Sequence, residues 1–293
     1  MGTRTILAGI KSANTYWLLS LVLAVFGLGS SACFALDLMG PPASGLRQGQ
    51  FHIGADYSYS QMDLELTEGK WIEYLDHSSP LSGKYAESFT LKDFKLNKAH
   101  VNIGYGLADN WEGFLRLGGV NAKFGESNFY EEGEEFDSQT DLAIGCGIKA
   151  TFYEDGNLKI GGLFQVSRAE LDGKMRPNGW PVAGDSVQIE LTEIQIAVGP
   201  SYKLADNLLI YGGPFLHFVD GDLDDEYSAP EVDEEGTVTG FLTGKDSWAI
   251  EERSIFGSYI GAQVDLADNC SVNFEYQHTS AADAVGVGLL WKF

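Results

Sequence analysis

The chain has 293 residues, of which 36 are glycine and 12% are aromatic, and its 42 acidic against 19 basic residues give a net charge of −23. Hydrophobic residues make up 44% of the sequence, which is too much for a disordered acidic chain. The strongly acidic balance argues against a nucleic-acid-binding protein, because such proteins need basic residues to neutralise phosphates. Composition therefore leaves a folded β-protein, either soluble or embedded in a membrane.

Residues 1–35 have the organisation of a Sec-type signal peptide. Arg4 and Lys11 form a basic start, residues 16–28 are an uncharged apolar stretch, and residues 30–35 are mostly small. The apolar stretch, about 13 residues long, is shorter than the roughly 20 residues that a membrane-spanning helix needs. We therefore expect export by the Sec pathway, with residues 36–293 forming the mature protein.

The cleavage position is less well defined than the signal peptide itself. Cleavage after Ala35 or after Ala32 fits the small residues at the end of the segment. Lipidation of Cys33 is a third alternative, which the sequence disfavours because Ser30 stands where a lipobox usually has leucine. Removing residues 1–35 takes away two basic and no acidic residues, so the mature chain carries 17 minus 42, or −25.

Four short segments predict tight turns between β-strands. Residues 107–110, 204–207 and 266–269 all read Leu-Ala-Asp-Asn, and residues 154–157 read Glu-Asp-Gly-Asn. Asp, Asn and Gly tolerate positive φ, which two-residue hairpin turns require. Polar and apolar residues alternate with period two on both sides of each turn, which indicates paired strands.

This alternation predicts ten strands, near residues 48–64, 94–107, 111–124, 139–153, 157–170, 187–204, 208–219, 252–266, 270–279 and 284–293. The other connections are long, polar and mostly acidic, and we expect them to be loops: Thr67–Leu91, Gly125–Ser138, Asp172–Ser186 and Asp220–Ile250. Short turns at one end and long loops at the other are typical of outer-membrane barrels.

The last strand carries a specific signal. Apolar side chains alternate to the final residue and place four of them on one face: Val287, Leu289, Trp291 and Phe293. This ending resembles the C-terminal insertion signal of bacterial outer-membrane β-barrels. The resemblance implies an all-β, antiparallel, up-and-down transmembrane barrel of about ten strands, with eight or twelve as alternatives. It also implies a Gram-negative outer membrane, contact with its lipid, and folding by the barrel-assembly machinery.

By the same alternation, charged residues of both signs point into the barrel. The candidates for lining a pore are Asp56, Lys98, Arg116, Lys149, Glu193, Asp265 and Glu275. A ten-stranded barrel has a narrow interior. The mixed charges can therefore pair and seal it, or they can line a narrow hydrophilic pore.

One acidic segment resembles a calcium-binding loop. Asp220, Asp222 and Asp224 alternate, and Glu231 is the twelfth residue counted from Asp220, as in loops that bind Ca²⁺ through oxygen ligands. The match is imperfect, because Asp225 stands where the loop needs glycine. A divalent cation such as Ca²⁺ is the only cofactor that the sequence suggests.

No catalytic motif appears in the chain. Omptin proteases are ten-stranded barrels with Asp and His at the rim, but only Asp76 and His77 offer such a pair here, and no wider motif supports them. We expect a protein without enzymatic activity. The leading hypothesis is a structural and surface-interaction scaffold that acts through acidic extracellular loops, and the alternative is a narrow, cation-preferring, porin-like channel.

Overall fold

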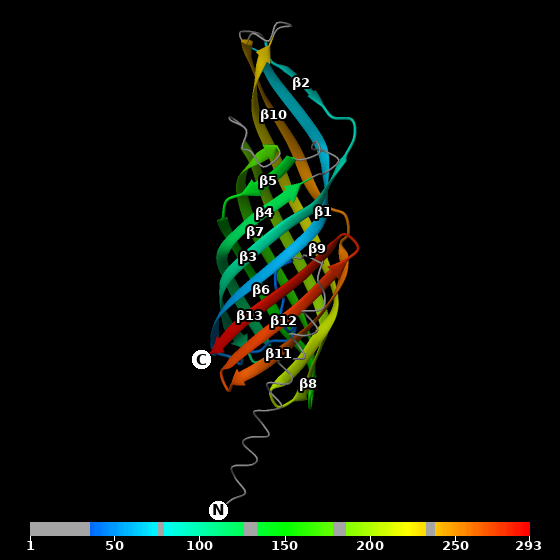
Figure 1. Ribbon diagram of the computed structural model, residues 1–293. Helices are drawn as coiled ribbons and strands as arrows, with labels where there is room; N and C mark the ends of the chain where they lie inside the picture. The colour runs from blue at the N-terminus through cyan, green and yellow to red at the C-terminus, as the bar shows by residue number, and fades with distance from the viewer. Residues whose placement is uncertain (1–35, 76–78, 126–133, 178–185, 233–237) are drawn as a thin grey trace, which may run out of the picture. The chain divides into compact units, whose positions relative to one another are not determined.

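The computed structural model of the protein describes residues 36–75, 79–125, 134–177, 186–232 and 238–293 (Figure 1). All regular secondary structure in these ranges is β-strand. The strands are β1 (Phe51–Leu75), β2 (Leu81–Lys84), β3 (Phe89–Ala108), β4 (Trp111–Gly125), β5 (Glu134–Ser138), β6 (Asp141–Asp155), β7 (Leu158–Pro177), β8 (Ser186–Ala205), β9 (Leu208–Val232), β10 (Val238–Glu252), β11 (Phe256–Ala267), β12 (Cys270–Thr279) and β13 (Ala282–Lys292). None of the described residues forms a helix long and apolar enough to cross a membrane.

These segments close into an antiparallel ring of ten strand positions. β5 and β6 share one position between β4 and β7, and β10 and β11 share another beside β9. β2 is a short addition to β1. The ring closes because β13 pairs with β1, and β10 pairs with β1 beyond the shorter β12–β13 hairpin. The predicted ten-stranded antiparallel barrel is therefore confirmed.

All four predicted tight turns are present. β3 and β4, β6 and β7, β8 and β9, and β11 and β12 are each joined by two residues. In the β6–β7 turn, Gly156 adopts φ of 56°, a left-handed conformation in which a side chain is unfavourable. The short sequence repeats thus fix the hairpins at one end of the barrel.

The prediction of long loops at the other end of the barrel is largely wrong. β1 continues to Leu75, β7 to Pro177 and β9 to Val232, and β10 begins at Val238, so most of these residues lie in strands. Alternation continues through these segments, but their outward residues are polar and mostly acidic. Carboxylates on the outer face of a strand are as polar as loop residues, so polarity alone does not distinguish the two.

The polarity of the two wall faces inverts along the strands. Near the tight turns the outward side chains form an exposed apolar band: Phe51, Ile53, Tyr57, Val101, Ile103, Tyr105, Leu115, Leu117, Leu142, Ile144, Phe164, Ile196, Val198, Ile210, Ile260, Val287 and Leu289. Inward aromatic side chains such as Phe114, Phe215 and Tyr259 are buried at this level. Most of the other inward side chains here are polar and buried: His52, Asp56, Lys98, His100, Asn102, Glu112, Gln165, Glu193, Gln195, His217, Asn273, Glu275 and Gln277. We call the interior at this level the polar lumen.

Beyond the band the arrangement reverses. The outward residues become polar, as at Gln61, Asn97, Asn121, Thr192 and Asp220. The inward residues become apolar and fully or almost fully buried: Leu64, Leu66, Leu91, Phe94, Leu96, Phe124, Phe136, Leu171, Ile189, Leu223, Trp248 and Ile250. This part of the wall, which we call the extension, has the facing of a protein that stands in water around its own apolar core.

Aromatic rings close the interior of the extension. Phe124 stacks on Phe136 with ring centroids 4.7 Å apart, and Phe94 lies 5.8 Å from Phe124. These three side chains come from β3, β4 and β5 and are at most 2% exposed. These rings belong to the cluster of buried hydrophobic side chains that makes up the apolar interior of the extension.

We predict that Phe124→Ala destabilises the extension by about 3–5 kcal/mol, because it removes a buried ring from a packed core. The measurement is denaturant unfolding in detergent micelles. Phe241→Ala is the matched control, since Phe241 is 53% exposed, and it should change stability much less. Equal losses for both variants would contradict the closed core.

Candidate functional site

The polar lumen is filled by the segment that precedes the first strand. Residues 36–48, which we call the plug, follow an irregular path, and Leu36 to Gly40 are all buried. The plug ends where Gly49 donates a backbone hydrogen bond to the carbonyl of Gly106, close to the β3–β4 turn. From this rim the plug extends into the barrel toward the extension.

Side chains of the wall bind the backbone of the plug near the tight turns. Glu275 accepts hydrogen bonds from the amides of Met39 (2.9 Å) and Gly40 (2.8 Å). Glu112 accepts one from the amide of Gly45 at 2.9 Å, and Lys292 donates to the carbonyl of Gly45 at 3.2 Å. Carboxylate acceptors of backbone N–H groups form strong, charge-assisted hydrogen bonds, so these contacts hold the plug firmly.

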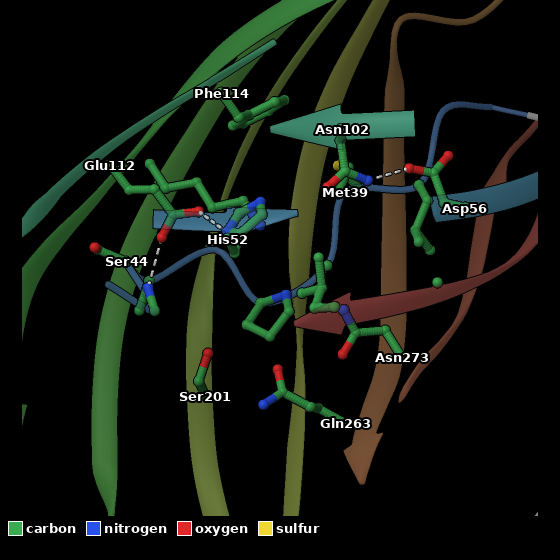
Figure 2. Close-up of a pocket in the computed structure, with 18 of the residues that line it drawn as sticks. Met39, Ser44, His52, Asp56, Asn102, Glu112, Phe114, Ser201, Gln263 and Asn273 are labelled. Atoms are coloured by element: carbon green, nitrogen blue, oxygen red, sulfur yellow. Dashed lines mark hydrogen bonds and ion pairs between the residues drawn. The ribbon is translucent and has the colours of Figure 1, made fainter. Parts of the chain in front are cut away.

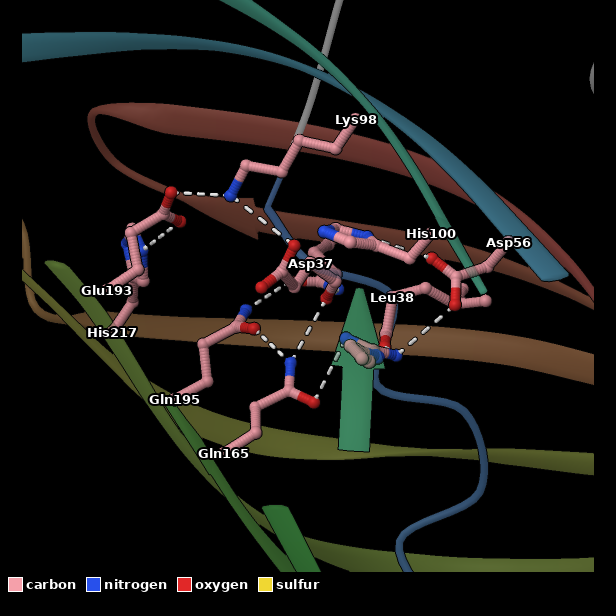
Figure 3. A network of polar contacts seen from close by, with 11 residues as sticks. Asp37, Leu38, Asp56, Lys98, His100, Gln165, Glu193, Gln195 and His217 are labelled. Atoms are coloured by element: carbon pink, nitrogen blue, oxygen red, sulfur yellow. Dashed lines mark hydrogen bonds and ion pairs between the residues drawn. The ribbon is translucent and has the colours of Figure 1, made fainter. Parts of the chain in front are cut away.

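At its other end the plug joins a network of buried charges (Figure 3). The ammonium of Lys98 lies 2.5 Å from Glu193 and 3.3 Å from Asp37 of the plug. Glu193 also lies 3.3 Å from His217. Lys98 and Asp37 are each 3% exposed at the side chain. Buried charges need partners to offset their desolvation, and here a wall lysine bridges a wall carboxylate and the plug.

A second ion pair lies beside the first. Arg116 is 3.7 Å from Asp56 and donates to the carbonyl of Leu38 in the plug. Asn102 donates to Asp56 at 2.8 Å, and His100 lies 3.4 Å from the same carboxylate. Asp56 is thereby surrounded by donors from two strands.

Carboxamide side chains complete the network. Gln165 donates to Gln195 at 2.5 Å, Gln195 donates to Gln277 at 2.9 Å, and Gln277 donates to the carbonyl of Asp37 at 2.8 Å. These residues come from β7, β8 and β12. The plug is thus bonded, directly or through these side chains, to β7, β8 and β12 as well as to β3, β4 and β13.

A cavity lies between the plug and the wall. It has a volume of about 210 Å³ and lies among plug and wall residues, including His52, Glu112, Lys149 and Asn273 (Figure 2). Its walls mix apolar side chains with both signs of charge. It is large enough for several water molecules.

The structure places six of the seven pore-lining candidates in the interior: Asp56, Lys98, Arg116, Lys149, Glu193 and Glu275. Asp265 differs, because it is exposed near the end of β11, where it accepts a hydrogen bond from Gln263 at 3.0 Å. The interior residues contact one another and the plug.

The suggested calcium loop does not form. Asp220, Asp222, Asp224 and Glu231 all lie in β9, an extended strand, so the segment cannot wrap around one ion. Asp224 instead accepts from Ser247 at 2.6 Å and pairs with Lys245 at 3.1 Å. Among the described residues, no three His, Cys, Asp or Glu side chains are grouped so that they could hold a metal ion.

The four residues of the predicted insertion signal lie on the outer face of β13. Val287, Leu289, Trp291 and Phe293 are all exposed. Phe293 stacks on Phe51 with centroids 4.9 Å apart, and its amide donates to the carbonyl of Phe51 at 2.9 Å. The end of the chain thereby joins the beginning of β1, which closes the ring.

A cluster of acidic and aromatic side chains lies in the extension. Tyr85 donates to Asp246 at 2.9 Å, and Tyr227 donates to Glu73 at 3.1 Å. Burial raises the pKa of Asp246, and the nearby Glu73 carboxylate raises it further. Burial and the bond to Asp246 also raise the pKa of Tyr85 to about 12.

Sequence reasoning missed the plug and the apolar interior of the extension. The plug has no periodic pattern, and its only signals are Leu and Met residues interspersed with Gly and Pro after the predicted signal peptide. The only sequence signal for the apolar interior is the alternation of apolar and polar residues, which continues beyond the predicted strand ends. Residues 1–35, Asp76 and His77 lie outside the described residues, so the signal peptide remains a prediction.

Residues 108–293 match the family model described as the outer membrane protein beta-barrel domain. The chain belongs to this family, whose members are outer-membrane barrels of Gram-negative bacteria. The apolar band is accordingly the membrane-facing surface, and the polar lumen lies at membrane level.

Solved structures of outer-membrane barrels resemble the chain at low identity. They include the translocator domain of the autotransporter NalP from Neisseria meningitidis, with 13% identity, a TM-score of 0.41 and 98% of each chain covered. The outer membrane protein OprG from Pseudomonas aeruginosa gives 11% identity and a TM-score of 0.39, covering 85% of this chain and 98% of OprG. Comparison with curated protein sequences gives no significant match.

We predict that Glu275→Ala loosens the plug. The variant removes two charge-assisted hydrogen bonds, each worth about 1.5–3 kcal/mol, so amide hydrogen exchange at Met39 and Gly40 should accelerate at least about tenfold. Glu154→Ala is the control, because Glu154 pairs with Lys159 outside the plug contacts. Unchanged exchange in Glu275→Ala would show that these bonds do not hold the plug.

The acidic cluster predicts a pH effect on the extension. A carboxyl whose pKa is raised by folding stabilises the folded state fully below its unfolded pKa, and this contribution is lost as pH rises through the folded pKa. Asp246→Asn should therefore raise the melting temperature at pH 7 and flatten its dependence across the mildly acidic range. Thermal unfolding from about pH 4, near the ordinary pKa of an aspartate, up to pH 7 tests this, with Asp220→Asn as an exposed control. A lower melting temperature for Asp246→Asn at pH 7 would contradict it.

Proposed function

We propose that the protein is a closed, non-enzymatic outer-membrane scaffold whose extension provides a surface for interaction. The observation that supports this most strongly is the double closure of its interior. The plug fills the polar lumen, and aromatic and aliphatic side chains fill the extension. Ions crossing such a barrel would have to displace both.

The outer face of the extension is the part available for contact outside the membrane. It carries acidic residues on neighbouring strands, including Asp63, Glu65, Glu170, Asp172, Glu190, Asp220 and Asp222. Two arginines offset part of this charge. Arg253 lies 3.7 Å from both Asp63 and Glu65. Arg168 lies 3.6 Å from Glu170 and 2.5 Å from Glu190, so two cations face four of these carboxylates. An acidic surface of this kind suits basic or cation-bridged partners. Loose association with divalent cations, including Ca²⁺, belongs to this proposal.

Export and assembly follow from the same proposal. A Sec-type signal peptide would deliver the chain to the periplasm, and the outward apolar residues of β13 would serve as the signal for the barrel-assembly machinery. Outer-membrane lipid would then surround the apolar band.

We predict that the refolded protein is electrically silent in a planar bilayer, with folding confirmed by heat-modifiable gel mobility. A variant lacking residues 36–46 should also stay silent, because the apolar interior of the extension remains. Reproducible cation-selective steps from the intact protein would instead support the alternative, a narrow cation-preferring channel. Steps only after plug deletion would show that the extension is not closed.

A further inference from the structure

The cavity between the plug and the wall reaches the tight-turn end of the barrel. Its lining includes Lys159, which follows the β6–β7 turn closely, and Lys292 at the end of β13. The side chain of Lys159 is 38% exposed, so this edge of the cavity meets solvent. In outer-membrane barrels the short turns face the periplasm. A small solute can therefore enter from that side without passing the extension.

Lys149 is the cation of this cavity that lacks a close acceptor. In the described part of the chain its ammonium forms no ion pair or hydrogen bond, and it lies 5.8 Å from the centroid of the Phe114 ring. The other cations of the lining each have a partner: Arg116 has Asp56, Lys159 has Glu154, and Lys292 has the carbonyl of Gly45. An ammonium that is largely removed from water and has three unused N–H donors favours an added acceptor.

The nearest carboxylates are already held by the plug. Glu112 and Glu275 attract Lys149 through space without forming an ion pair with it. Glu275 accepts from the plug amides of Met39 and Gly40, and Glu112 accepts from a plug amide as well. Because these two negative groups stay near the cavity, they repel a multiply charged anion more strongly than a singly charged one. A ligand of Lys149 should therefore carry one negative charge.

A second donor points to the same space as Lys149. A Cβ atom placed on Gly40 would lie 3.2 Å from Nζ of Lys149 and 3.6 Å from Nδ2 of Asn273. Figure 2 shows Asn273 and Ser201 on the cavity wall. Oδ1 of Asn273 and Oγ of Ser201 are buried and have no hydrogen-bond partner among the described residues. Two N–H donors that converge from β6 and β12 suit the two oxygens of a carboxylate.

The rest of the cavity wall is largely apolar. Side chains from the plug and from the strands contribute to it: Leu38, Met39, Pro41, Phe114, Leu209 and Leu290. A pocket with a few converging polar groups on an apolar wall favours a ligand with one polar end and an apolar body. The cavity volume of about 210 Å³ restricts this body to a short chain.

We propose that the cavity binds a short-chain aliphatic monocarboxylate that enters from the periplasm. Its carboxylate lies beside Gly40, where it accepts hydrogen bonds from Lys149 and Asn273, and its aliphatic chain lies against the apolar part of the wall. The site does not depend on whether the barrel is closed to ions, because it is reached from the tight-turn end.

The first test is the binding of butyrate to the purified protein in detergent micelles, measured by titration calorimetry at constant ionic strength against protein-free micelles. We expect saturable binding. Butyramide has a similar shape but no charge, so it should bind at least about tenfold more weakly. Acetate lacks two CH₂ groups and should also bind about tenfold more weakly.

Two results of this titration would overturn the proposal. The first is the absence of saturable butyrate binding, as expected for a cavity that holds only water. The second is equal binding of butyrate and butyramide, which would show that Lys149 does not recognise the charge.

The second test uses Lys149→Met, with folding confirmed by heat-modifiable gel mobility. This variant should bind butyrate at least about tenfold more weakly, because the charge-assisted hydrogen bond is lost. Lys123→Met is the matched control, since Lys123 is 57% exposed at the side chain and pairs with Asp137. Unchanged butyrate binding by Lys149→Met would overturn the assignment of Lys149.

A third measurement needs no variant. A small amine-reactive reagent such as methyl acetimidate is applied to the native protein, and modification of each lysine is followed by mass spectrometry. Saturating butyrate should slow the modification of Lys149 at least about tenfold and leave that of Lys123 unchanged. A Lys149 that does not react in the free protein, or that reacts equally fast with butyrate present, would overturn the proposed site.

Discussion

A β-strand directs alternate side chains to opposite faces, and in a closed barrel this alternation cannot change without a bulge. Most of the long strands keep one parity from the membrane level into the extension. β1 and β3 change it within the extension: the pairing of β1 shifts between Thr67 and Lys70, and Leu91 and Phe94 of β3 are both buried. The sequence nevertheless reverses which face is apolar, as β1 does between Asp56 and Leu64. One continuous wall can therefore stand in lipid at one end and in water at the other.

The polar interior at membrane level follows from this constraint. It places charged side chains where water cannot fully hydrate them. Lipid requires apolar side chains outside, so the inward positions are free to be polar, and many of them are charged. A ten-stranded barrel is too narrow to hydrate these groups fully. The plug solves this by supplying backbone amides to Glu275 and Glu112 and the Asp37 carboxylate to Lys98.

The plug and the extension thus close the barrel by different physical means. The plug is held mainly by hydrogen bonds and ion pairs, which depend on complete partnering of buried groups. The interior of the extension is held by apolar packing, which includes Phe94, Phe124 and Phe136. A solute would have to break both kinds of interaction, and this supports our proposal of a scaffold.

The amino-acid sequence by itself determined the strand class, the four tight turns, the ten positions and the outward face of β13, because these depend on local turn chemistry and on alternation between neighbours. It also indicated six of the seven charged residues expected to point inward; Asp265 is instead exposed. Only the tertiary structure decided that predicted loops such as residues 220–232 are strands, that Asp220, Asp222 and Asp224 do not form a loop, and that residues 36–48 fill the lumen. These features depend on contacts between residues far apart in the chain, such as Asp37 with Lys98 and Met39 with Glu275, and no local pattern encodes such contacts.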